Sequence, residues 1–491
     1  MPAILAAILV FFCSGCVLVL EILAGRLLAP YVGISLETYT AIIGTVLAGI
    51  AAGTWLGGKL ADHVDPRRLL GPTVALGGML ALFTVPVVRA LGSDLSGDGT
   101  RLTTVWLTVA GFFLPAFVLS AVDPMVVKLQ LRDLDRTGGV VGMLSGIATV
   151  GALVGTFVTG FLLVSTTPTR TIIYAVGGVL VATGIALTVW LARRQTAVVM
   201  VIAVIGAAGV TIAATSEEPC DLESAYYCIH VERDTLNPSG RTLWLDDLRH
   251  SYVDVKDPTN LAFEYIQSFA DVAEARFPDH PPVDALHIGG GGFTMPRYLR
   301  AVYPGSRSTV LEIDESVVKT NRERLGLKTG PDLKVRIGDA RTGIRTRPDD
   351  SADFVISDAF GSLSVPWHLT TTEFIDDVER VMRDDGVYVL NIIDYPPLRF
   401  VRAELRTLQE HFPYVAAIAP QALFDGLDGG NVVLVAANQP LDEETLRSLV
   451  TAKGNVLVTG RELDRLIDGA PVITDDFAPI DQWLDQDKGG E

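Results

Sequence analysis

Seven long apolar runs dominate the first 214 residues of this 491-residue chain. Each run is close to the roughly 20 residues that an α-helix needs to cross the hydrocarbon core of a bilayer. A cleaved signal peptide is not expected, because the first run continues into Glu21 and Arg26 without a small-residue cleavage site. The sequence therefore predicts a bundle of seven transmembrane helices over residues 1–214, with the runs at about 3–24, 38–60, 69–91, 103–121, 139–165, 171–192 and 197–214.

Glycines four residues apart recur within these runs. This spacing lets two helices approach closely, either inside one bundle or between the subunits of a homo-oligomer. Glu21 and Arg26 are charged residues in an apolar context, and they indicate either pairing at a helix end or a transport role. The glycine pattern occurs at Gly49-x-x-x-Gly53-x-x-x-Gly57, Gly142-x-x-x-Gly146 and Gly151-x-x-x-Gly155.

The short loops between the runs predict an orientation. Basic residues in cytoplasmic loops outnumber those outside, so the loop set richer in Lys and Arg should be cytoplasmic. This places the amino terminus in the cytoplasm and, after seven crossings, the rest of the chain outside the cytoplasm. The richer set comprises Lys59, Arg67, Arg68, Lys128, Arg132, Arg136, Arg193 and Arg194, against Arg26, Arg89, Arg101 and Arg170 on the other side.

Cys220 and Cys228 are the two cysteines that follow the apolar part. In an oxidising compartment they could form a disulfide, whereas in the cytoplasm they would stay reduced. The sequence leaves both alternatives open.

The acidic excess behind the net charge of −18 lies after residue 214. Such a surface repels nucleic acid and attracts polycations, although an ordinary solubility charge is the favoured explanation. No nucleic-acid partner is expected.

Residues 284–294 read as a strand, a glycine-rich turn and the start of a helix, and residues 310–314 read as a second strand. Gly289, Gly290 and Gly291 would let the backbone pass close to a ligand. Glu312, at the tip of the second strand, would accept hydrogen bonds from ribose hydroxyls. The pattern predicts a nucleoside-binding βαβ unit.

Asp339 and Asp358 follow two further predicted strands, at residues 333–337 and 352–357. Open parallel sheets bind ligands outside the carboxyl ends of their strands, so these carboxylates and Glu312 should converge on one pocket. For any one of them alone, a helix cap or a turn is the alternative.

The order of Gly-Gly-Gly at 289–291, Glu-Ile-Asp at 312–314, Gly-Asp-Ala at 338–340 and Ile-Ser-Asp at 356–358 resembles that of spermidine synthases, the polyamine aminopropyltransferases. The resemblance covers roughly residues 220–440. It implies a small β-hairpin domain with a linking helix at 215–282, followed by a Rossmann-type, methyltransferase-like parallel sheet at 283–491. The apolar half and residues 473–479 resemble the membrane-fused branch of the family.

The resemblance also implies roles for single residues. Glu312 would bind the ribose of decarboxylated AdoMet, Asp339 would lie on its adenine side, and Asp358 would take a proton from an attacking amine such as putrescine. His250 and Glu264 are the acceptor-side candidates. No metal is expected, because the donor's sulfonium already activates the leaving group.

The chain departs from the family pattern at several positions, which include Phe263-Glu264, where the family has a Tyr followed by Gln or His, and the region of His250, where it has a Gln. Gly292 stands where the family has an Asp that holds the donor's amino group, and Gly361 stands at the family's second carboxylate. Two other functions therefore stay open: an AdoMet-dependent methyltransferase acting on a membrane-proximal substrate, and a non-catalytic polyamine or nucleoside sensor or transporter.

Overall fold

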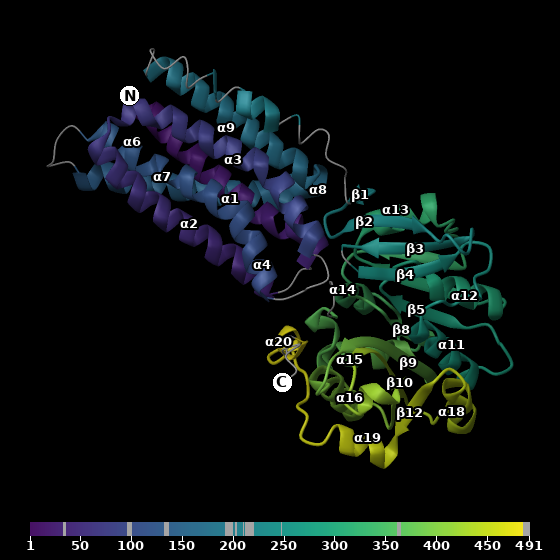
Figure 1. The fold of residues 1–491 in the computed structure, drawn as a ribbon. Coiled ribbons are helices and arrows are strands. Elements are labelled where there is room, and N and C mark those ends of the chain that lie inside the picture. The colour runs from purple at the N-terminus through teal and green to yellow at the C-terminus, as the bar shows by residue number, and fades with distance from the viewer. Residues whose placement is uncertain are drawn as a thin grey trace. The chain divides into compact units, whose positions relative to one another are not determined.

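The chain forms two compact units, Met1–Cys228 and Ile229–Glu491, both drawn in Figure 1. The computed structural model describes residues 1–32, 36–95, 101–131, 137–191, 200–201, 204–209, 211, 220–246, 248–360 and 365–484.

The first unit is helical. Within the described residues, six helical segments are long and apolar enough to cross a membrane. Half of the predicted seventh run, at 197–214, falls outside the described residues, so the number seven stays a prediction. The elements are α1 (Ala3–Val32), α2 (Leu36–His63), α3 (Pro66–Leu95), α4 (Arg101–Thr108), the π-helical turn η1 (Val109–Phe113), α5 (Leu114–Ser120), α6 (Val122–Gln130), α7 (Thr137–Val158), the π-helical turn η3 (Thr159–Leu163), α8 (Val164–Thr166) and α9 (Thr169–Leu191).

Two of the glycine patterns lie at helix contacts inside this unit. A Cβ at Gly53 of α2 would lie 2.0 Å from the carbonyl oxygen of Phe117 in α5. A Cβ at Gly151 of α7 would lie 2.1 Å from the carbonyl oxygen of Phe11 in α1. These helices therefore pack backbone against backbone, which any larger side chain would prevent. Gly142 and Gly146 have no neighbour of this kind within 4 Å among the described residues.

The second unit begins with a small antiparallel sheet and a helix. The strands β2, β3 and β4 pair in chain order, with a register shift between Leu243 and Trp244. These strands occupy the region where the sequence predicts a β-hairpin domain, and the boundaries of that domain stay a prediction. The elements are β2 (Cys228–Arg233), β3 (Gly240–Leu245), β4 (Leu248–Asp254) and α11 (Glu264–Arg276), preceded in the chain by β1 (Leu222–Glu223).

An eight-stranded sheet forms the centre of the second unit, in the order β12-β10-β11-β9-β8-β5-β6-β7. Its strands are β5 (Asp284–Ile288), β6 (Arg307–Glu312), β7 (Leu333–Ile337), β8 (Ala352–Ser357), β9 (Met382–Asp394), β10 (Tyr414–Pro420), β11 (Gly430–Ala437) and β12 (Asn455–Thr459). The segment from β7 to β9 is parallel. Its order is that of a Rossmann-like fold, with a reversal between β5 and β8.

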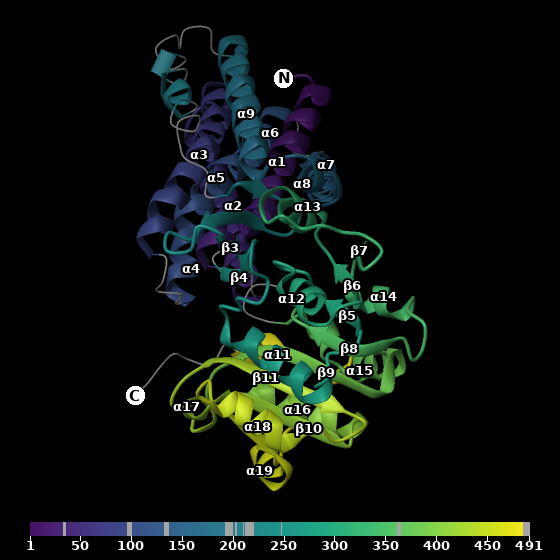
Figure 2. The ribbon, with the colours of Figure 1, turned by 90° about the vertical axis from the view of Figure 1, so that its right-hand side faces the viewer.

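Helices cover both faces of this sheet (Figure 2). Buried side chains of α11, α12 and α18 form one core with the sheet, and those of α14, α15, α16 and α19 form the other. The remaining helices are α12 (Thr294–Val302), α13 (Glu315–Arg324), α14 (Ala340–Arg345), the 3₁₀ turn η4 (Trp367–Leu369), α15 (Thr372–Val381), α16 (Arg399–His411), α17 (Gln421–Phe424), α18 (Glu443–Thr451), α19 (Gly460–Leu466) and α20 (Ile480–Leu484).

The prediction of a parallel sheet is wrong for one edge. β11 pairs antiparallel with β9, and β10 pairs antiparallel with both β11 and β12. β10 and β11 are joined by a short connection that contains only the four-residue α17. Parallel neighbours need a crossover of a dozen residues or more, so a connection of this length makes the two strands antiparallel.

Candidate functional site

The candidate site lies at the carboxyl ends of the parallel strands. The strand order reverses between β5 and β8, and ligands of open α/β sheets bind in the crevice outside such a reversal. The glycine turn follows β5, Glu312 ends β6, and Asp358 follows β8 directly.

The glycine turn needs its glycines for two physical reasons. Gly289 has a φ of +91° and Gly291 a φ of +47°, the left-handed region that favours glycine. A Cβ at Gly289 would also lie 2.6 Å from the carbonyl oxygen of Asp358. The turn therefore runs directly beside the residue that follows β8.

Glu312 binds the backbone of this turn. Its Oε2 accepts a hydrogen bond from the Gly290 N–H at 2.8 Å, and its Oε1 accepts one from the Asp314 N–H at 2.9 Å. The side chain is buried, and burial raises the pKa of Glu312 to about 7, against the lowering effect of these hydrogen bonds. The structure thus brings Glu312 and the glycine turn together.

Asp358 is held by two side chains that the sequence analysis missed. The Tyr265 hydroxyl donates to Asp358 Oδ2 and the Asn391 amide donates to Oδ1, both at 3.1 Å. Burial raises the pKa of Asp358 to about 6, while these two hydrogen bonds lower it. Burial and the neighbouring Asp358 charge raise the pKa of Tyr265, so its hydroxyl stays protonated and can donate.

Each of the two missed residues carries a weak signal in the sequence. Asn391 is a polar residue inside the otherwise apolar strand β9, and it is buried. Buried polar side chains are rare and usually have a hydrogen-bond partner, so Asn391 could have been chosen from the sequence as a candidate site residue. Tyr265 follows Glu264 in the first turn of α11, and only the fold shows which of the two points at Asp358.

A cavity of about 590 Å³ opens beside Asp358. His250 and Glu264, the predicted acceptor-side residues, both contribute to its wall. Burial lowers the pKa of His250 to about 4, so the imidazole is neutral at physiological pH. The lining also includes Leu248, Arg249, Ala262, Phe263, Tyr265, Ser268, Phe360, Asn391, Ile393, Ile418, Leu423, Asp428, Asn431 and Val433.

The structure does not gather all three predicted carboxylates at this cavity. Among the described residues, Asp358 lines it, whereas Glu312 and Asp339 do not. Asp339 caps α14 by accepting from the Thr342 N–H at 3.1 Å, and its Oδ2 lies 2.9 Å from His368 Nε2. Its carboxylate is therefore already engaged.

The position of Gly292 leaves no room for an acidic side chain without rearrangement. Its N–H donates to Ser251 Oγ at 2.9 Å. A Cβ there would lie 2.7 Å from Val253 Cγ2 and 2.8 Å from Ser251 Cβ. Strand β4 thus occupies the space in which the family's Asp would stand. Gly361 lies outside the described residues.

Part of the chain is similar to known proteins. Residues 266–421 match the family described as the spermine/spermidine synthase domain. The chain is 32% identical over 112 residues to a polyamine aminopropyltransferase of Vibrio vulnificus, covering 22% of this chain and 38% of that protein. It is 31% identical over 190 residues to one of Pyrobaculum calidifontis, covering 36% and 62%.

Among solved structures, a probable spermidine synthase from Corynebacterium glutamicum is similar, with 29% identity, a TM-score of 0.49 and coverage of 51% of this chain and 94% of that one. The matched part of the chain spans about two fifths of the Vibrio protein and about three fifths of the Pyrobaculum protein.

Proposed function

Because this chain is a spermidine synthase-like protein, we propose that it transfers an aminopropyl group from decarboxylated AdoMet to an amine such as putrescine. The observation that supports this most strongly is the position of Asp358. Its carboxylate is held between Tyr265 and Asn391, on the wall of a cavity and directly beside the glycine turn.

The proposed reaction is a displacement at carbon. The acceptor nitrogen attacks the aminopropyl carbon bonded to the sulfonium, a C–N bond forms, and the C–S bond breaks. The electron pair of that bond stays on sulfur, which leaves as neutral methylthioadenosine. An aliphatic amine is mostly protonated at neutral pH, so a base must hold its proton before or during the attack.

Asp358 is suited to this proton transfer. A general base is most effective when its pKa lies near the working pH, and burial brings the pKa of Asp358 to about 6. Its ionised form also attracts the cationic acceptor. In the same proposal Glu264 contributes negative charge at the cavity wall, and the neutral His250 contributes a hydrogen-bonding group.

The donor side of the proposal rests on Glu312 and the glycine turn. Two carboxylate oxygens at a strand tip suit the paired hydroxyls of a ribose. Asp339, paired with His368, is proposed to lie on the adenine side. Gly292 removes the group that would select the donor's amine, so we expect weaker discrimination between decarboxylated AdoMet and AdoMet than in a chain with an Asp there.

Product analysis tests the proposed function. The purified full chain, given decarboxylated AdoMet and putrescine, should release methylthioadenosine and spermidine in equal amounts. The same chain given AdoMet is the control. Release of S-adenosylhomocysteine from AdoMet, with no methylthioadenosine from the decarboxylated donor, would replace aminopropyl transfer by methyl transfer. No product from either donor would favour a binding role.

We also propose that the catalytic part acts outside the cytoplasm. Strand β1, which follows the helices in the chain, contacts one end of the helical unit. Its Glu223 pairs with Arg26 Nη2 at 3.1 Å and accepts a hydrogen bond from the Thr169 N–H at 3.1 Å. Thr169 begins α9, and Arg26 lies near the end of α1. This contact supports the helix-end pairing role for Arg26.

Of the basic loop residues, those that the structure describes lie at the other end: Lys59, Arg67, Arg68 and Lys128. There Lys128 Nζ pairs with Asp62 at 2.5 Å, and Gln130 donates to the Met1 carbonyl at 3.1 Å. The positive-inside rule puts that end in the cytoplasm, so the Glu223 end faces out. Cys220 and Cys228 form a disulfide beside Glu223, which suits an oxidising compartment.

Labelling with a membrane-impermeant maleimide tests this orientation. In a chain whose natural cysteines are replaced by Ser, Leu236→Cys should react in intact cells, because Leu236 is 93% exposed in the second unit. Arg67→Cys, at an exposed position at the start of α3, is the matched control and should react only after permeabilisation. The reverse pattern would place the catalytic part in the cytoplasm.

A further inference from the structure

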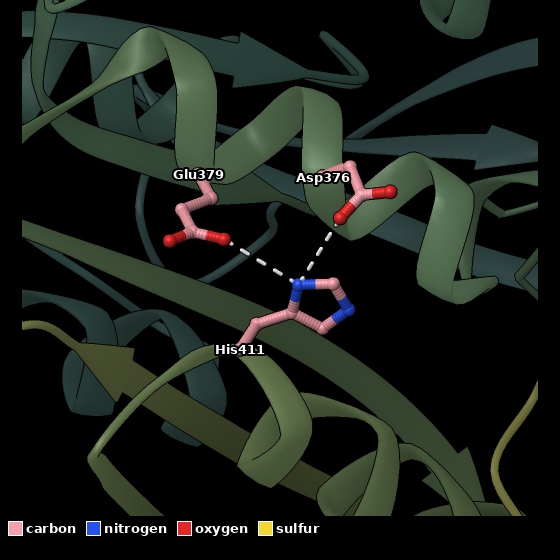
Figure 3. Close-up of side chains that lie close together, drawn as sticks. All are labelled: Asp376, Glu379 and His411. Carbon is pink, nitrogen blue, oxygen red and sulfur yellow. Dashed lines mark hydrogen bonds and ion pairs between the residues drawn. The ribbon is translucent and has the colours of Figure 1, made fainter.

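Three side chains of the kinds that ligate metals lie close together on α15 and α16, and none of them lines the cavity beside Asp358. Asp376 and Glu379 lie one turn apart on α15, so their carboxylates point from the same helix face. His411 is the last residue of α16 and directs Nδ1 at both of them (Figure 3). The cluster therefore joins two helices that are adjacent in the core.

The distances in this cluster favour a shared cation over an ordinary ion pair. His411 Nδ1 lies 3.3 Å from Asp376 Oδ1 and 3.4 Å from Glu379 Oε2, and neither is preferred. A charged hydrogen bond would draw one of them to about 2.7–2.9 Å. Bonds of about 2.0–2.2 Å to a tetrahedral Zn²⁺ place neighbouring ligand atoms roughly 3.3–3.5 Å apart.

A fourth residue outside the cluster orients the imidazole. His411 Nε2 lies 2.6 Å from Thr372 Oγ1. When Nε2–H donates to this oxygen, the proton is on Nε2 and the lone pair of Nδ1 points at the two carboxylates. Ligating histidines characteristically have their second nitrogen held in this way. In that tautomer three electron-pair donors face one point, an arrangement that a bound cation would stabilise.

The imidazole of this cluster is buried, whereas its two carboxylates are exposed to solvent. The His411 side chain is only 10% exposed, whereas those of Asp376 and Glu379 are 67% and 44% exposed. The imidazole is thus fixed by packing, and an ion can reach the carboxylates from solvent. One nitrogen and two carboxylate oxygens leave a fourth tetrahedral position for water.

We propose that Asp376, Glu379 and His411 bind a divalent transition-metal cation of the Zn²⁺ class. This ligand set is borderline in softness, which favours Zn²⁺ and its first-row neighbours over Mg²⁺ or Ca²⁺. The ion would cross-link α15 to the end of α16. The sequence analysis did not foresee this site, because His411 lies far along the chain from the acidic pair.

Metal analysis of the full chain tests the proposal. The protein, purified in detergent without a polyhistidine tag and stripped with a chelator, is dialysed against Zn²⁺ and its zinc content is measured. We expect about one ion per chain in the wild type and near-complete loss of that ion in His411→Ala and in Asp376→Asn. Zn²⁺ should raise the thermal unfolding midpoint of the wild type but not of the variants.

His280→Ala is the matched control. His280 pairs with a single carboxylate, that of Glu274, at 2.7 Å, the length of an ordinary charged hydrogen bond. This variant should keep the wild-type zinc content. Since Asp376 is exposed, its Asn variant should fold, so loss of zinc there would not reflect unfolding. Equal zinc content in the wild type, Asp376→Asn and His411→Ala would overturn the proposal and leave the cluster as an ion pair.

Discussion

Asp358→Asn should lower the rate of transfer by roughly 10²- to 10⁴-fold, the usual contribution of a positioned general base. Asn has nearly the shape of Asp and can still contact Tyr265 and Asn391, so the cavity wall should survive. It cannot take a proton from the acceptor, however, and it no longer attracts a cationic amine. Donor binding, measured by calorimetry, should change little because Glu312 is untouched.

The pH dependence supplies the matching control. The base works only when ionised, so the rate should rise with pH through the pKa of Asp358, about 6. Tyr265→Phe removes a hydrogen bond that lowers this pKa, so the rising limb should move to higher pH while the plateau remains. A shift to lower pH, or full activity in Asp358→Asn, would remove Asp358 from the proposed role.

The sequence was sufficient for those parts of the fold that follow from local pattern. The first apolar run, expected at 3–24, lies in α1 (Ala3–Val32), which is eight residues longer at its carboxyl end. The turn after Ile288 needs Gly289 and Gly291 because both have a positive φ. Strand β6 (Arg307–Glu312) ends two residues before the predicted end at 314, and Glu312 lies at its tip as predicted. The length of an apolar run, the positions of glycines and the residue at the end of a strand can all be read along one segment of the sequence.

The parts that failed depend on contacts between distant segments. Asp358 receives its hydrogen bonds from α11 and from β9, 93 and 33 residues away in the chain. No local pattern encodes such partners. The antiparallel edge formed by β10, β11 and β12 was missed for a similar reason, because apolar strands look alike in either direction and the short connection decides.

Asp339 illustrates a third limit. Its place after β7 was predicted, and the structure agrees. That it is held by His368 Nε2 at 2.9 Å could not be predicted, because His368 comes from a turn between β8 and α15. A strand-tip carboxylate is therefore a candidate until its neighbours are known, which is why the helix cap was the right alternative to keep.

Glu312→Gln should weaken binding of a nucleoside donor by roughly 10- to 100-fold. Hydrogen bonds to a charged acceptor contribute about 1.5–3 kcal/mol, and each 1.4 kcal/mol is about tenfold in Kd. Gln keeps the size of the side chain and one carbonyl oxygen for the Gly290 N–H, so the turn should hold. The measurement is calorimetric titration of the purified chain with decarboxylated AdoMet and with methylthioadenosine.

Asp332→Asn is the control for this titration, since Asp332 is a surface carboxylate paired with Arg300 and its loss should leave the Kd unchanged. The pH series sharpens the test. Burial raises the pKa of Glu312 to about 7, and hydroxyl donors bind the ionised form better. Affinity should therefore rise as the pH passes upward through about 7 in the wild type and stay flat in Glu312→Gln. An equal Kd for both chains at pH 8 would mean that the nucleoside, if bound at all, is held elsewhere than at the glycine turn.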